Sequence, residues 1–147
     1  MSNINEGIPM FSYERVVVTG ASGWLAQELV STLRKRGRCR IVGVSRNLLP
    51  FMDGLERMSN RAFLDEFKFL KGDVLIHCAF ERGSDGKGLA DSLEYSGKCF
   101  QKAIDGRASV INISSQAVYG SKNGPRSLET APLAPDYLYA LAKASSE

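Results

Sequence analysis

The chain has 147 residues, of which 44% are hydrophobic, and this is enough for one folded domain with its own core. A formal net charge of +3 does not indicate a nucleic-acid-binding protein, since the densest basic run, at 34–40, is typical of a solvated helix end. Three cysteines without a CxxC pair and a single histidine predict neither a disulfide framework nor a metal site. Residues 1–13 form a polar leader and no apolar run has membrane-spanning length, so we expect a reduced, cytoplasmic protein.

The first predicted elements are a strand, a helix and a second strand. Residues 15–19 (RVVVT) form a short, β-branched apolar run of the kind found in strands that are buried on both faces. Apolar side chains at helical spacing predict a helix over 24–36, and a second apolar run predicts a strand over 41–44. This order predicts parallel pairing of the two strands.

The rest of the chain continues the alternation. We expect a short edge strand over 55–58, then a helix over 61–70 whose inward residues are Phe63, Leu64, Phe67 and Leu70. Strands are predicted over 73–79 and 109–114, with a helix over 89–104 between them, and a last helix begins at 136. The predicted fold is α/β: a doubly wound, Rossmann-type parallel sheet of about five strands in the order 3-2-1-4-5. It forms one domain over 14–147 that ends within the last helix.

A glycine turn joins the first strand to the first helix. Gly20, Gly23 and Ala26 form G-x-x-G-x-x-A, in which the glycines permit a tight turn and close approach of a pyrophosphate, and the alanine permits close helix packing. Amide groups at the helix N-terminus would face the phosphates. The pattern favours a dinucleotide site over the alternative, a glycine turn without a ligand.

The end of the second strand predicts which dinucleotide is bound. A carboxylate there accepts from a free ribose 2′-hydroxyl, whereas a cation accommodates a 2′-phosphate. The chain has Ser45 and Arg46 at this place and no acid. Serine can donate to a phosphate and arginine can bind it through two nitrogens, so NADP is predicted in preference to NAD. The alternative is that Arg46 only faces solvent.

Four segments, TGASGWLA, DVLIHCA, ISSQAVYG and a YxxxK pair, follow one another in order over residues 15–147. Together they resemble the extended short-chain dehydrogenase/reductase family, particularly its NAD(P)-dependent nucleotide-sugar epimerases and dehydratases. The resemblance implies that Ser115, Tyr139 and Lys143 are catalytic. The resemblance also implies further cofactor-binding residues. Together with those of the glycine turn and the second strand, the predicted set is Gly20, Ser22, Gly23, Trp24, Leu25, Ser45, Arg46, Asn60, Cys78, Ala79, Tyr139 and Lys143.

The spacing of the pair has a physical reason. Residues four apart share a helix face, so Lys143 can lie beside Tyr139 but not, in that register, beside Tyr137. A free phenol is a weak base at neutral pH, and a neighbouring ammonium favours the phenolate. Ser115 would hydrogen-bond the substrate oxygen whose proton the tyrosine takes, while hydride moves to the nicotinamide. The alternative for each residue is a structural role: Tyr139 would be a half-buried aromatic residue, Ser115 a strand-end cap and Lys143 a solvated helix residue.

The chain also departs from the family pattern. Asn60 stands where an acidic residue is usual near the adenine, and Glu94 stands where an asparagine is often found, which would add a charge to the helix that supports the active site. We expect His77 to be a strand-end residue on the adenosine side and not a base.

Family members continue for more than a hundred further residues, which supply most of the substrate domain. The chain is therefore expected to be the cofactor-binding part of an enzyme that acts on a nucleotide sugar by transient or net hydride transfer. The resemblance further implies homodimerisation through the family's fourth and fifth helices, which here are the helix over 89–104 and the helix that begins at 136. Two alternatives stay open: a non-catalytic dinucleotide-binding module and a folded remnant.

Overall fold

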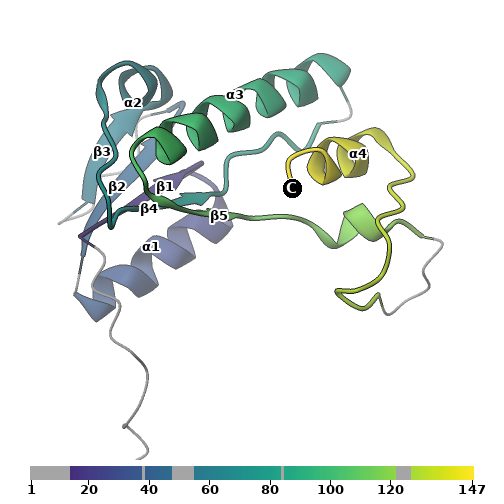
Figure 1. Ribbon diagram of the computed structural model, residues 1–147, viewed down its shortest axis with the longest axis horizontal. Coiled ribbons are helices and arrows are strands. Elements are labelled where there is room, and N and C mark those ends of the chain that lie inside the picture. The colour runs from purple at the N-terminus through teal and green to yellow at the C-terminus, as the bar shows by residue number, and fades with distance from the viewer. Residues whose placement is uncertain (1–13, 38, 48–54, 84, 122–126) are drawn as a thin grey trace, which may run out of the picture.

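Five parallel strands form the centre of the structure, a computed structural model that describes residues 14–37, 39–47, 55–83, 85–121 and 127–147 (Figure 1). The sheet order is β3-β2-β1-β4-β5, and every neighbouring pair is parallel. The predicted fold class and strand order are thus confirmed, including the short edge strand. The strands are β1 (Arg15–Thr19), β2 (Arg40–Ser45), β3 (Leu55–Ser59), β4 (Val74–His77) and β5 (Ser109–Asn112).

Helices connect the strands and begin and end at recognisable signals. Asp85 caps the first turn of its helix by accepting from the amides of Lys87 and Gly88, and Gly37 ends another helix in the left-handed conformation. The predicted leader, 1–13, lies outside the described residues. The helices are α1 (Trp24–Arg36), α2 (Asn60–Glu66), α3 (Gly86–Asp105), the 3₁₀ helix η1 (Gln116–Tyr119) and α4 (Leu138–Ala144).

The sheet has a hydrophobic core on each face. Val16 and Val18 of β1 pack on the side of α1, whereas Val17 faces α2 and α3. Figure 1 shows α1 on one side of the sheet and α2 and α3 on the other. Because successive strand residues point to opposite faces, a strand that is covered on both sides must be apolar throughout, as RVVVT nearly is.

The prediction for the helix over 61–70 was wrong at its C-terminal end. α2 ends at Glu66, and Phe67 already has extended backbone angles. Alternate residues then face the core, so Phe69 is buried while Leu70 is 56% exposed. The rings of Phe63, Phe67 and Phe69 lie 5.0–5.9 Å apart, and this cluster replaces the predicted helical stripe.

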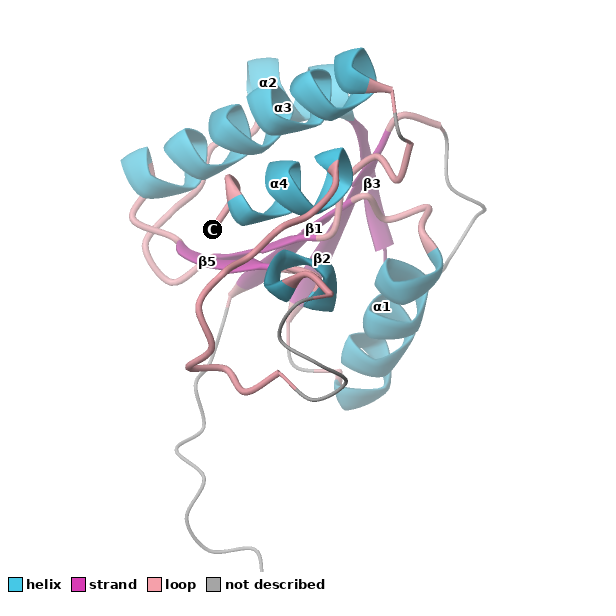
Figure 2. Ribbon diagram, turned by 90° about the vertical axis from the view of Figure 1, so that its right-hand side faces the viewer, coloured by secondary structure: helices cyan, strands magenta, loops and turns pink. Residues whose placement is uncertain are grey.

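α4 lies beside α3 and near the end of β5 (Figure 2). The amide of Asn112 donates to the carbonyl of Ser146 over 2.8 Å, which ties the end of β5 to the residues after the helix. α4 ends at Ala144, and the hydroxyls of Ser145 and Ser146 donate to carbonyls of its last turn. None of the helices in the described ranges is long and apolar enough to cross a bilayer.

Candidate active site

A cleft of about 460 Å³ lies at the carboxyl ends of the strands, and we call it the glycine cleft. This is the place where open parallel sheets bind ligands. The glycine turn, the end of β2, the start of α2 and the segment after β4 all contribute to it. Its lining residues are Gly20, Ser22, Gly23, Ser45, Arg46, Asn60, Cys78, Ala79, Phe80, Glu81, Asp91, Ser92 and Tyr95.

The glycine turn is shaped for close contact between backbone segments. Gly20 has φ +67°, and a Cβ atom there would lie 2.8 Å from the backbone nitrogen of Ala79. Gly23 precedes α1 without a side-chain cap, and the first turn of α1 has no acidic residue. Amide groups at this helix end are therefore suited to an anion such as a pyrophosphate.

Three residues that the sequence singled out lie outside the glycine cleft. Trp24 and Leu25 are on the first turn of α1, but their side chains are 77% and 46% exposed and do not line the cleft. Glu94 forms an ion pair with Lys98 one turn later, over 2.6 Å, on the exposed surface of α3. The charge of Glu94 is thereby balanced away from the site.

The end of β2 brings two polar side chains to the cleft. The hydroxyl of Ser45 donates to the carbonyl of Asn47, so in this conformation its proton is not directed at a ligand. A guanidinium nitrogen of Arg46 lies 3.6 Å from a carboxylate oxygen of Glu81, which follows β4. Arg46 is thus exposed but faces an acid across the cleft and does not only face solvent.

Asn60 supplies a further polar atom to the cleft. Its Oδ1 is buried, and no hydrogen-bond partner exists for it among the described residues. A buried acceptor without a donor is costly. The adenine of a dinucleotide carries an amino group that can donate to such an oxygen, so the residues present fit this cofactor.

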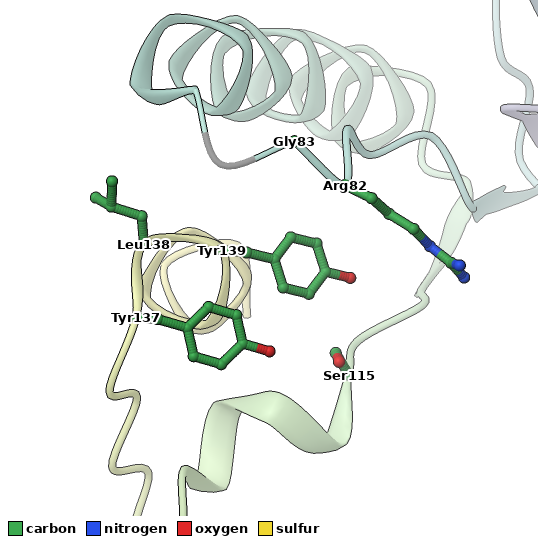
Figure 3. Close-up of a pocket in the computed structure, with 6 residues that line it drawn as sticks. All are labelled: Arg82, Gly83, Ser115, Tyr137, Leu138 and Tyr139. Carbon is green, nitrogen blue, oxygen red and sulfur yellow. The ribbon is translucent and has the colours of Figure 1, made fainter.

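A second cavity, of about 580 Å³, lies beside α4, and we call it the tyrosine pocket. Figure 3 shows the phenols of Tyr137 and Tyr139 projecting from α4 toward the side where Ser115 lies, with Leu138 pointing away. Ser115 accepts from the amide of Ala117 and so caps η1, which leaves its hydroxyl proton free to donate. The lining residues are Arg82, Gly83, Ser115, Tyr137, Leu138 and Tyr139.

Lys143 is close to the tyrosine pocket but does not line it. The residue is 4% exposed, and its ammonium donates to the carbonyl of Ile113 over 2.7 Å. It also lies 4.2 Å from the ring centre of Phe80, whose ring packs edge-on against Tyr139 at 6.0 Å. Burial lowers the pKa of Lys143, while the nearby Cys78 and Glu147 raise it.

Phe80 is the functional candidate that the sequence interpretation missed. Its ring lines the glycine cleft and contacts both members of the tyrosine and lysine pair. It therefore connects the glycine cleft with the tyrosine and lysine pair. The available signal was its place, directly after the DVLIHCA strand, where a parallel sheet presents ligand contacts.

Tyr137 lies beside Tyr139 at the start of α4. It is the N-cap residue of α4 and 55% exposed, and its ring is stacked on Tyr139 with centres 6.2 Å apart. Its phenol lines the same pocket as that of Tyr139. Lys143 contacts the ring of Phe80, and this ring packs against Tyr139.

His77 is fully buried and does not line the cleft, which corrects its predicted place on the adenosine side. Its Nδ1 and Nε2 atoms lie 2.8 Å from the hydroxyls of Thr19 and Ser96. Burial, assisted by the charge of Lys143, lowers the pKa of His77 to about 4. A neutral imidazole whose two nitrogens both have hydrogen-bond partners has a structural role.

The described part of the chain holds no cluster of three potential metal ligands.

The buried imidazole predicts a loss of stability in mild acid. The unfolded chain binds a proton at His77 below pH 6.5, whereas the folded chain does so only below about 4. Stability therefore falls as the pH drops through this window, by about 2 kcal/mol between pH 7 and pH 5. Urea unfolding at the two pH values measures the loss. Because the chain has one histidine, His77→Gln should remove most of this difference, and an unchanged difference would assign it to the carboxylates.

In the comparison with protein families, the model described as the NAD dependent epimerase/dehydratase family matches residues 16–147, nearly the whole chain. No curated protein matches the chain by sequence.

Solved structures share the fold at low sequence identity. UDP-N-acetylglucosamine 4-epimerase from Bacillus cereus matches with a TM-score of 0.75 and 17% identity over 90% of this chain and 48% of that chain. A UDP-galactose 4-epimerase matches with a TM-score of 0.77 and 23% identity over 90% of this chain and 49% of that chain. The Bordetella bronchiseptica enzyme WbmG, in complex with NAD and UDP, matches with a TM-score of 0.71 and 19% identity over 92% of this chain and 48% of that chain. The chain thus spans about half the length of these proteins.

Proposed function

Because this chain belongs to the NAD-dependent epimerase/dehydratase family, we propose that it supplies the cofactor-binding and proton-transfer residues of an enzyme acting on a nucleotide sugar. The reaction class is transient or net hydride transfer between a sugar carbon and a nicotinamide. The proposed domain covers 14–147 and follows the leader at 1–13. Related solved structures include nucleotide-sugar 4-epimerases, which supports this substrate class.

The observation that carries the proposal is the placing of Ser115 and Tyr139 in one pocket beside the glycine cleft. The two residues are 24 positions apart in the sequence, but η1 and α4 bring their hydroxyls to the same cavity (Figure 3). Lys143 is on the same helix and meets Tyr139 through the ring of Phe80. These are the three residues that the sequence predicted as catalytic.

In the proposed mechanism, the proton and the hydride leave the sugar in different directions. The Ser115 hydroxyl donates to the sugar oxygen and orients it. The Tyr139 oxygen takes the proton of the sugar hydroxyl as the sugar carbon is oxidised, and returns a proton when that carbon is reduced. The ammonium of Lys143, which donates to the carbonyl of Ile113, supplies positive charge near the site. The nicotinamide, when bound, accepts and returns the hydride.

We further propose that the cofactor is NADP in preference to NAD. The end of β2 carries Arg46 and no carboxylate, and the guanidinium is at the edge of the glycine cleft. A 2′-phosphate would accept two hydrogen bonds from it. Gly20 and Gly23 would hold the pyrophosphate, and Asn60 would accept from the adenine amino group.

Calorimetric titration of the chain with NADPH and NADH tests the cofactor proposal. We expect both to bind, with NADPH about tenfold tighter, since one charge-assisted pair is worth roughly 1.4 kcal/mol at such a partly exposed site. Arg46→Ala should remove this difference by weakening NADPH alone. Lys35→Ala, at the solvated end of α1, is the matched control for loss of a positive charge. Equal affinities in the parent chain would refute the NADP preference, and no binding would refute the cofactor site.

Two wider features of the proposed enzyme are its compartment and its assembly. Cys39, Cys78 and Cys99 are free thiols, which suits a cytoplasmic protein. A homodimer through α3 and α4 has support in the exposed apolar side chains Ile104, Leu138 and Leu141. The molar mass in solution, measured by light scattering, decides between monomer and dimer.

A further inference from the structure

Glu81 is an acidic residue at the place where the proposed cofactor would carry its distinguishing phosphate. It belongs to the segment after β4, and its carboxylate oxygen lies 3.6 Å from the guanidinium of Arg46 at the end of β2. Both residues line the glycine cleft. The pair therefore spans the cleft between two segments that are 35 positions apart in the sequence.

This ion pair contributes little to the stability of the fold. The side chains of Arg46 and Glu81 are 75% and 43% exposed, and pairs in such surroundings stabilise proteins by about 0–1 kcal/mol. The backbone of the same segment is held independently, because the amide of Glu81 donates to the hydroxyl of Ser92. A change of charge at Glu81 should therefore leave the fold in place.

The pair does affect which anion can reach Arg46. A 2′-phosphate and the Glu81 carboxylate are both acceptors for one guanidinium, and its planar fork cannot serve both fully. Binding of a phosphorylated dinucleotide must displace the carboxylate and leave it near a group of the same sign. A dinucleotide with a free 2′-hydroxyl can bind without displacing the Glu81 carboxylate from Arg46.

We propose that Glu81 is a specificity-determining residue that lowers the affinity for NADP by competing for Arg46. The inference rests on the proposed function, since it assumes a dinucleotide in the glycine cleft. It assigns the balance between NADP and NAD to two positions, one on β2 and one after β4. Arg46 attracts the 2′-phosphate, and Glu81 limits that attraction.

The test is Glu81→Gln, titrated calorimetrically with NADPH and NADH. Removing the competing charge should tighten NADPH by about three- to tenfold and leave NADH within about twofold. The gain should shrink at 0.5 M salt, because screening weakens exposed charges. In an Arg46→Ala background the same substitution should tighten NADPH by clearly less, because only the repulsion between the carboxylate and the 2′-phosphate is left to remove, and it should leave NADH unchanged.

Asp65→Asn is the matched control. Asp65 is an exposed carboxylate of α2 that pairs with Arg61 over 3.5 Å and does not line the glycine cleft, so its removal should leave the cofactor ratio unchanged. A Glu81→Gln variant that changes the affinity for both cofactors equally, or that tightens NADPH as much without Arg46 as with it, overturns the inference. If both cofactors bind and only the ratio fails to respond, the proposed function stands and the inference falls. If the parent chain binds neither, both fall together.

Discussion

Replacing Tyr139 with phenylalanine is expected to lower turnover by at least about a hundredfold and to leave cofactor affinity within about twofold. The substitution removes one oxygen, the only atom of this side chain that can exchange a proton with a sugar hydroxyl. General acid and base catalysis contributes about 10²–10⁴ to rates, and this sets the size of the loss. The ring contacts with Phe80 and Tyr137 are kept, so packing around Lys143 should not change.

Turnover is measured with a nucleotide-sugar substrate in a form of the protein that carries both the cofactor-binding and the substrate-binding parts. Cofactor affinity is measured in the chain described above. Tyr137→Phe is the matched control: it removes an equivalent phenol from the same pocket but from outside the YxxxK spacing. We expect it to retain at least about a tenth of the turnover. Equal losses for the two variants would contradict the assignment of the proton to Tyr139 alone.

The fold could be predicted from the sequence because each strand carries its own signal. Runs such as RVVVT and DVLIHCA contain three consecutive apolar residues, as a strand covered on both faces requires. The glycine turn and the YxxxK spacing are also local patterns. They predicted Gly20, Ser22, Gly23 and Tyr139, which line the glycine cleft or the tyrosine pocket, and also Trp24, Leu25 and Lys143, which do not.

The contacts that the sequence did not predict join residues from separate segments. Phe80 meets Lys143 and Tyr139 only because α4 packs near the end of β4, and Glu81 meets Arg46 only across the cleft. No periodicity relates positions 35 or 60 residues apart. The early end of α2 has a similar cause. The extended segment after Glu66 buries both Phe67 and Phe69 and leaves Leu70 exposed.

Gly20→Ala is expected to lower the free energy of unfolding by about 2–4 kcal/mol and to weaken dinucleotide binding at least tenfold. Gly20 has φ +67°, where an L-residue is strained by about 1–2 kcal/mol. The added Cβ would also lie 2.8 Å from the nitrogen and Cα of Ala79, which are backbone atoms and cannot rotate away. Relief requires the glycine turn and the segment after β4 to separate. The amides at the start of α1 would then be displaced from the phosphates.

Gly97→Ala is the control that gives the opposite result. Gly97 lies within α3, and a Cβ there would meet no atom within 4 Å. An alanine in a helix is favoured over glycine by roughly 0.5–1 kcal/mol, so this variant should be more stable and bind cofactor normally. Urea unfolding and calorimetric titration of both variants measure the two effects. If Gly20→Ala proved as stable as the parent chain, the close approach of the glycine turn to Ala79 would be refuted. If it were destabilised yet bound the dinucleotide normally, the turn would hold the fold without holding the phosphates.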